Sequence, residues 1–163
     1  QDVRDFLVYD LSVLLATEQA TLPVASQLEQ EASDPDAKQM FSDSAFNMQR
    51  QIARIQECFR SFGAQPLSVS CPIIDGFTRE REQFMLQGPD AQLVDLFNLV
   101  HSARIGRYKI GIYRDLIQGA RDLGYDYCVD PLQETLQEKE AIVQRTEQLA
   151  GRITQRIIQR TGP

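Results

Sequence analysis

The sequence predicts an all-α fold, an antiparallel four-helix bundle with a short extra helix in the connection between helices 2 and 3. Four long segments lie between breaks rich in glycine and proline, and each carries apolar residues at alternating steps of three and four. That spacing is typical of helices packed nearly parallel, whereas the alternation expected of strands is absent. With 163 residues and 42% hydrophobic side chains, residues 1–163 fit a single domain.

The first two helices are expected at about residues 3–32 and 36–62. Between them, Ser33 or Asp34 can cap a helix and Pro35 suits its first turn. The inward stripe of the first helix is Leu7, Leu11, Leu14, Glu18, Thr21, Ala25 and Leu28. The stripe of the second is Phe41, Ala45, Met48, Ile52, Ile55, Phe59 and Phe62. Each stripe should be buried against the other helices.

A longer connection follows at Gly63–Pro72, whose glycine and prolines disfavour a helix. A short helix is expected at about residues 73–86. It offers five apolar side chains that we expect to form a partner surface, together with the outer faces of the first two helices. These five are Ile73, Ile74, Phe77, Phe84 and Met85.

The last two helices are expected at about residues 91–123 and 131–160. Gly124 should end the third long helix in the C′ position, and Asp130-Pro131 should begin the fourth. Residues 125–128 (Tyr-Asp-Tyr-Cys) are expected to be an aromatic loop between them. The two stripes are Leu96, Leu99, Ala103, Gly106, Ile110, Tyr113, Ile117 and Ala120, and Leu132, Leu136, Lys139, Val143, Thr146, Ala150, Ile153 and Ile157.

The charge balance excludes some classes of function. A formal net charge of −6 argues against a general nucleic-acid binder, which needs a basic surface. No apolar run approaches the roughly 18 residues of a membrane span, and no signal-peptide pattern opens the chain. Arginines at positions 145, 152, 156 and 160 give the last helix a basic face, which we interpret as solvated or as complementing the acidic first helix.

Cysteine and histidine use argues against zinc and against nucleophilic catalysis. Cys58, Cys71 and Cys128 are widely spaced and form no Cys-x-x-Cys pair, and His101 is the one histidine. A disulfide framework is therefore not expected, although one disulfide with a leftover thiol stays open. We expect free thiols, a cytoplasmic protein and no catalytic residues.

Two charged residues interrupt the apolar stripes. Glu18 lies in the middle of the first stripe, and Lys139 lies in the fourth between Leu136 and Val143. A charge facing a bundle core needs a partner. Carboxylates that converge inside a bundle are how dinuclear iron and manganese sites are built, because hard oxygen donors balance the metal charge.

The chain resembles the bacterial ferritin-like stress proteins of the YciE/YciF type from about Phe6 to Ala150. The motifs that carry the resemblance are Ala16-Thr-Glu-Gln19, Cys71-Pro-Ile-Ile-Asp-Gly76 with Phe77, Tyr108 with Tyr113, and Leu132-Gln-Glu-Thr-Leu136. The resemblance implies a dimeric ferritin-like bundle in which carboxylates and a histidine hold a dinuclear metal centre.

The chain departs from that pattern at most of the ligand positions. The resemblance places ligands where this chain has Ser44, Asn47, Gly106, Arg107, Lys109 and Lys139. Glu18 is the ligand position that is clearly retained, and Glu138 is a residual candidate expected to point off the stripe. Cations at ligand positions would repel Fe²⁺ or Mn²⁺.

We therefore hypothesise that a buried ion pair replaces the metal. Glu18 would pair with Lys139, with Arg107 or Lys109 as the competing partner. Two alternatives remain open: the charges could snorkel separately to solvent, or a true metal site could use Glu18, Glu134, Glu138 or Glu140.

The expected function is a non-catalytic binding or structural module, associated with stress, without cofactor, homodimeric and open to a protein partner. The rival expectation is an iron or manganese ferritin-like oxidase or peroxide-detoxifying protein. The two differ in the number of Glu and His ligands on the inward stripes.

Overall fold

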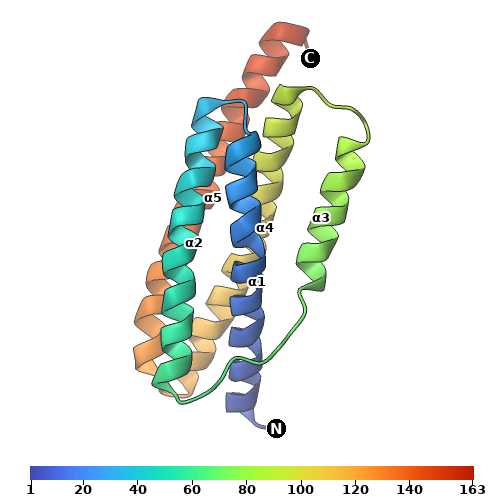
Figure 1. Ribbon diagram of the computed structural model, residues 1–163. Helices are drawn as coiled ribbons and strands as arrows, with labels where there is room; N and C mark the ends of the chain where they lie inside the picture. The colour runs from blue at the N-terminus through green and yellow to red at the C-terminus, as the bar shows by residue number, and fades with distance from the viewer.

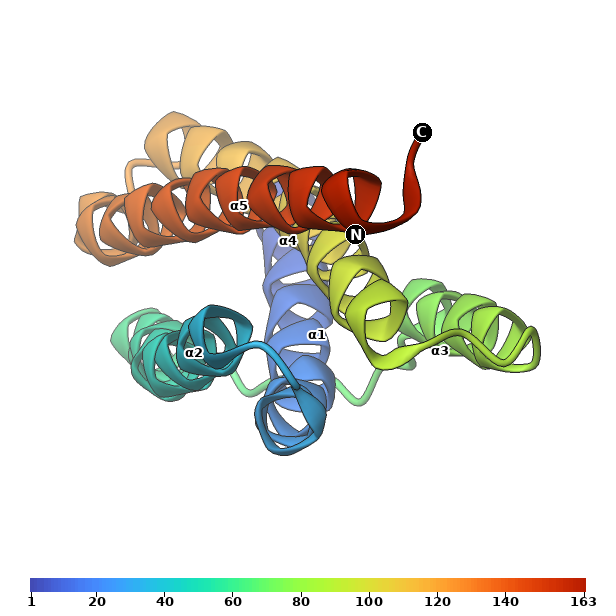
Figure 2. The same ribbon diagram turned by 90° about the horizontal axis from the view of Figure 1, so that it is seen from above.

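The computed structural model describes residues 1–163 as five helices with no strand. The helices are α1 (Val3–Glu31), α2 (Pro35–Ser61), α3 (Pro72–Met85), α4 (Ala91–Asp122) and α5 (Asp126–Thr161). α1, α2, α4 and α5 form a bundle, and α3 lies outside it against α1 and α4 (Figures 1 and 2). The predicted fold class is confirmed.

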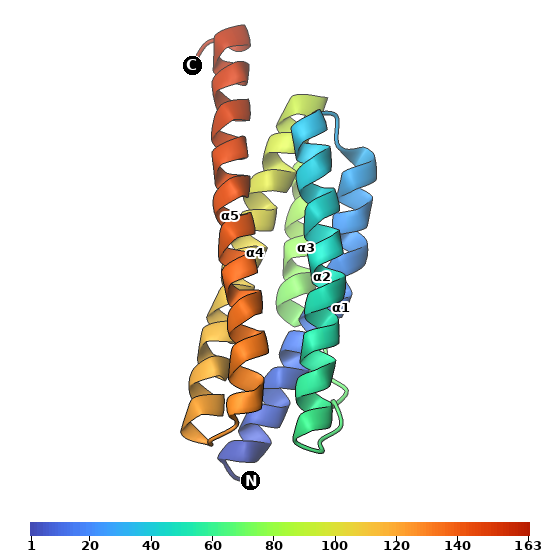
Figure 3. The same ribbon diagram turned by 90° about the vertical axis from the view of Figure 1, so that its left-hand side faces the viewer.

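Neighbouring helices of the bundle are antiparallel. α1 and α5 run in one direction and α2 and α4 in the other, with α3 returning the chain along the outside (Figure 1). One long connection, carrying α3, therefore joins two helical hairpins. The last turns of α5 extend beyond the other helices (Figure 3).

The helix ends follow the local chemistry of the sequence. Asp34 caps α2 by accepting hydrogen bonds from the backbone N–H groups of Asp36 and Ala37, and Pro35 begins the helix. Gly124, at φ 75°, takes the left-handed conformation after α4. The Tyr125 amide there bonds to the carbonyl of Ala120, which satisfies a terminal acceptor.

The expected loop at residues 125–128 is wrong, because α5 begins at Asp126 rather than at about residue 131. Pro131 lies inside the helix, in its second turn, where its missing N–H removes one backbone hydrogen bond. The first turn is also anchored by packing, since Cys128 is 2% exposed within the core. Tertiary burial thus outweighed the proline signal.

The basic face of α5 pairs with helix starts rather than with α1. Arg156 contacts Asp34 at 2.6 Å and Arg160 contacts Asp90 at 3.3 Å, and both acids are N-caps. Arg145 contacts Asp43 of α2 at 2.7 Å. These pairs are exposed on at least one side, so they fix register more than they add stability.

The apolar core has two main parts. One joins Leu7–Leu15, Ile55–Phe59, Tyr113–Ala120 and Cys128–Leu132 near the start of α1. The other joins Leu28–Ala32, Ala37–Phe41, Leu99 and Leu149–Ile153 near the other end. In every helix of the bundle, the residues between these parts include buried polar side chains.

α4 and α5 approach each other closely at Gly106. A Cβ atom there would lie 2.5 Å from the Cγ2 atom of Val143, too close to be accommodated without movement. Val143 is β-branched and stiff in a helix, so it cannot easily turn aside. Gly111, one and a half turns on, has nothing near a Cβ atom.

We predict opposite effects of alanine at these two glycines. Gly111→Ala should raise the free energy of unfolding by about 0.5–1 kcal/mol, because alanine favours the helix. The free energy of unfolding of Gly106→Ala should be about 1–3 kcal/mol lower than that of Gly111→Ala, because overpacking against Val143 offsets the gain in helix stability. Urea unfolding of both variants measures the difference. Equal stabilities would contradict the close approach.

Candidate functional site

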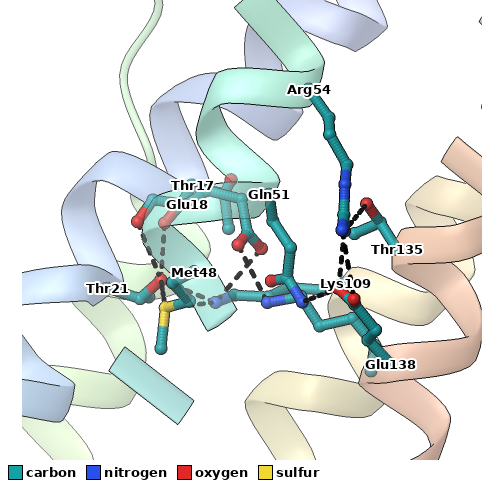
Figure 4. A network of polar contacts seen from close by, with 10 residues as sticks. Thr17, Glu18, Thr21, Met48, Gln51, Arg54, Lys109, Thr135 and Glu138 are labelled. Atoms are coloured by element: carbon teal, nitrogen blue, oxygen red, sulfur yellow. Dashed lines mark hydrogen bonds and ion pairs between the residues drawn. The ribbon is translucent and has the colours of Figure 1, made fainter. Parts of the chain in front are cut away.

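Several buried polar side chains from the bundle helices meet in one layer of polar contacts (Figure 4). Glu18 on α1 is fully buried, at 0% exposed. The Lys139 Nζ atom lies 2.8 Å from Glu18 Oε2, and the Lys109 Nζ atom lies 3.2 Å from Glu18 Oε1. One carboxylate therefore faces two ammonium groups, one from α4 and one from α5.

Hydroxyl and thioether groups complete the surroundings of Lys109. Its ammonium donates to Thr21 Oγ1 at 2.6 Å and lies 3.7 Å from the Met48 sulfur. Thr21 in turn donates to the backbone carbonyl of Thr17, so its oxygen is free to accept from Lys109. Lys109 thus donates two hydrogen bonds and makes an ion pair with Glu18.

A second group of charges adjoins this layer (Figure 4). Arg54 on α2 donates to Glu138 Oε1 at 2.6 Å, to Thr135 Oγ1 at 3.2 Å and to Glu134 at 3.1 Å. Gln51 donates to the same Glu138 oxygen at 3.2 Å. Glu138 is thereby neutralised from α2.

Burial and neighbouring charge act in opposite directions on these groups. Burial lowers the pKa of Lys109 to about 7, although the Glu18 carboxylate acts to raise it. Burial alone would raise the pKa of Glu18, but Lys109 and Lys139 more than offset that, so the pKa lies below its ordinary value. Glu18 is therefore ionised at neutral pH.

The pKa of Glu138 is also low. Partial burial acts to raise this pKa, but the hydrogen bonds from Arg54 and Gln51 lower it by more than burial raises it. For Tyr113, burial and the nearby Glu18 raise the pKa well above its ordinary value, so its hydroxyl stays protonated.

Three expected site residues lie together and one does not. Glu18, Lys109 and Lys139 form the contact described above, with both lysines on the same carboxylate. Arg107 as a partner of Glu18 is wrong: its side chain is half exposed and pairs with Glu147 on α5. One position beyond Gly106, it points away from the bundle axis.

The residues expected as a partner surface are also divided. Ile74 is 6% exposed, so the prediction that it forms part of a partner surface is wrong: it lies on the buried side of α3. Phe84 stacks on Phe97 of α4, and Phe77 packs edge-on against His101. Ile73 and Met85 remain exposed.

Sequence reasoning missed Gln51, Arg54 and Asp95. Gln51 is three residues after Met48 and four before Ile55, a helical spacing that would have placed it inward. Asp95 is 2% exposed and accepts hydrogen bonds from the backbone of Ser33 and Asp34, holding the α1–α2 turn. The sequence did not indicate that Asp95 would be buried, because it lies one position before the stripe residue Leu96 and so off the predicted inward stripe.

The donor set does not fit a dinuclear metal centre. No three His, Cys, Asp or Glu side chains lie where they could hold one metal ion. The carboxylate at the centre is already paired with two ammonium groups, and Glu138 is bound by Arg54. Positive charges at this position oppose a divalent cation.

Residues 2–159 match the protein family described as a domain of unknown function, DUF892. The chain belongs to this family. No helix of the bundle is long and apolar enough to cross a membrane. No match was found among curated proteins.

Several solved structures share the fold of this chain. The Escherichia coli stress protein YciF is 21% identical, with a TM-score of 0.89 over 95% of this chain and 98% of YciF. YcfI from Rhodopseudomonas palustris is 26% identical, with a TM-score of 0.85 over 90% of this chain and 94% of YcfI. A protein from Xanthomonas campestris is 16% identical, with a TM-score of 0.78 over 98% of both chains.

We predict a pH dependence that belongs to Lys109. Above pH 7 the folded chain has lost a proton that the unfolded chain keeps up to about pH 10.5, so the free energy of unfolding should rise with pH across this window. In Lys109→Met this rise should be smaller by up to about 1.4 kcal/mol per pH unit. Denaturant titrations from pH 7 to 9.5 measure it.

The exposed Lys38 provides the matched control, because its ammonium contacts only the carbonyl of Glu29. Lys38→Met should keep the wild-type slope. Parallel curves for the wild type and Lys109→Met would contradict a lowered pKa of Lys109 in the folded chain.

Proposed function

We propose that this chain is a non-catalytic ferritin-like module for binding or structure, in which an ion cluster stands at the position of a dinuclear metal centre. The observation that carries the proposal is the fully buried Glu18, held by the ammonium groups of Lys109 and Lys139. Those lysines occupy positions at which the YciE/YciF resemblance implies acidic ligands.

The surrounding residues support the same interpretation. Ser44, Gly106, Lys109 and Lys139 stand at implied ligand positions, and all four line one cavity in the bundle. None of these side chains supplies a carboxylate or imidazole. The degenerate positions thus converge in space, as expected if they descend from one site.

Electrostatics explains why the cluster would exclude a metal. At about 4 Å and an effective dielectric constant of about 20, two like unit charges repel by about 4 kcal/mol, and a divalent ion doubles this. Two ammonium groups act on any cation beside Glu18. One carboxylate cannot compensate for both.

The association with stress, the homodimer and the cytoplasm are further parts of this proposal. YciF is a stress protein, and it shares the fold of this chain. The exposed apolar side chains Val3, Phe6 and Tyr9 on α1, with Ile73 on α3, offer a surface for a second copy or another protein. The three cysteines are free thiols, as suits a reducing compartment.

Metal analysis of protein purified without chelators tests the central part. We expect iron and manganese far below one atom per chain, and no ferric-oxo absorption after Fe²⁺ and oxygen are added. Glu18→Ala is the control, because it removes the buried carboxylate. Near-stoichiometric metal that is lost in Glu18→Ala would overturn the proposal and favour the oxidase.

A further inference from the structure

A cavity of about 70 Å³ lies in the bundle core beside the ion cluster. Its walls are largely apolar and include Ala25, Leu28, Phe41 and Val143. Lys109 and Lys139 line it as well, so two ammonium groups border an apolar space. Small-molecule sites in proteins combine an apolar lining with a few polar groups in this way.

The ammonium of Lys139 is incompletely bonded. Its side chain is 8% exposed, and its hydrogen bond goes to Glu18 Oε2 at 2.8 Å. An ammonium has three donors, so two have no acceptor in the protein. Lys109, by contrast, reaches Glu18, Thr21 and Met48. The unsatisfied donors therefore belong to a buried cation that lines the cavity.

The charges of the cluster indicate the charge of the ligand. Below about pH 7 both lysines are protonated and one carboxylate faces two cations, which leaves one positive charge in excess. A single negative charge would balance it. An apolar ligand would leave both Lys139 donors unpaired, a neutral polar ligand would leave the excess charge unbalanced, and a cation would be repelled.

A second hollow of about 300 Å³ continues from the first towards α3. The two share Thr21, Val24, Leu28, Ser102 and Ile105 as walls, so they lie next to each other. Its outer lining is mixed: Ile74 and Phe77 of α3 are apolar, whereas Arg81, Asn98 and His101 are polar. An extended apolar chain could lie along this path between α1 and α4.

The sizes of the two hollows indicate an elongated ligand. A dry cavity of roughly 150 Å³ accepts benzene, so the inner space alone takes only a smaller group. A carboxylate with its first carbons matches the inner space, and the remaining chain would extend into the outer hollow. A bulky or branched headgroup would not pass.

We propose that this core cavity binds an unbranched, medium-chain monocarboxylate, with its carboxylate on Lys139 and Lys109 and its chain directed towards α3. The inference rests on the proposed function, because both require the lysines to stand where metal ligands would be. It adds the class of ligand that the binding module takes.

Calorimetric titration of the metal-free chain with octanoate tests the proposal. We expect saturable binding of about one octanoate per chain. Two probes separate its parts: 1-octanol keeps the chain without the charge, and acetate keeps the charge without the chain. Both should bind at least about tenfold more weakly than octanoate.

Three variants locate the site. Lys139→Met should weaken octanoate binding at least about tenfold, whereas Lys38→Met should change it less than about twofold. Val24 lines both hollows, so Val24→Phe fills space that the ligand would occupy and leaves every charge in place; it should also abolish binding. If Lys139→Met does not fold, the octanoate affinity of Val24→Phe tests the location of the site instead.

Equal affinity for octanoate and 1-octanol, unchanged binding in both Lys139→Met and Val24→Phe, or no binding at millimolar octanoate would overturn the inference. These outcomes differ from failure of the proposed function, which would appear as bound metal before any ligand is added. If the chain is metal-free and does not bind octanoate, the proposed ligand is wrong, whereas the proposal of a degenerate metal site is unaffected.

Discussion

The ion cluster of Glu18, Lys109 and Lys139 is the constraint on which the rest of the bundle depends. A fully buried carboxylate is tolerated only because two ammonium groups meet it, and these come from helices distant in the sequence. The cluster fixes the positions of α1, α4 and α5 relative to one another along the bundle axis. The apolar parts of the core lie on either side of the cluster and take their register from it.

The use of lysine rather than arginine at this place is significant. Only three of the 17 basic residues are lysines, and two of these three are buried here. A lysine ammonium is a compact point charge whose pKa responds to burial, whereas a guanidinium stays charged. Lys109 can thus become neutral as pH rises, and the cluster then carries no net charge. Arginine serves at the surface and in the Glu138 group.

The fold could be predicted because each long helix carries a stripe at alternating three- and four-residue steps. Glu18 and Lys139 stand on those stripes, which is why they attracted attention. Lys109 stands three residues beyond Gly106 and four before Tyr113, so its inward direction was also readable. Arg107, one residue after Gly106, falls off this spacing, which agrees with its pairing with Glu147 rather than Glu18.

Other features depended on tertiary packing. The first turn of α5 forms despite Pro131 because Cys128 is buried there, and no local signal reports that burial. The short helix α3 is amphipathic whichever face packs, so the burial of Ile74 could not be told from the exposure of Ile73. The cavity arises from the spacing of helices, which sequence periodicity does not encode.

The most direct test of this account compares the stability of the cluster with and without its charges. Glu18→Met alone leaves two buried ammonium groups unpaired and should lower the free energy of unfolding by about 3–5 kcal/mol. The triple variant Glu18→Met, Lys109→Met, Lys139→Met should return to within about 1 kcal/mol of the wild type or exceed it. If the triple variant instead loses the sum of the three single losses, the charges do not act as one unit, and the account is contradicted.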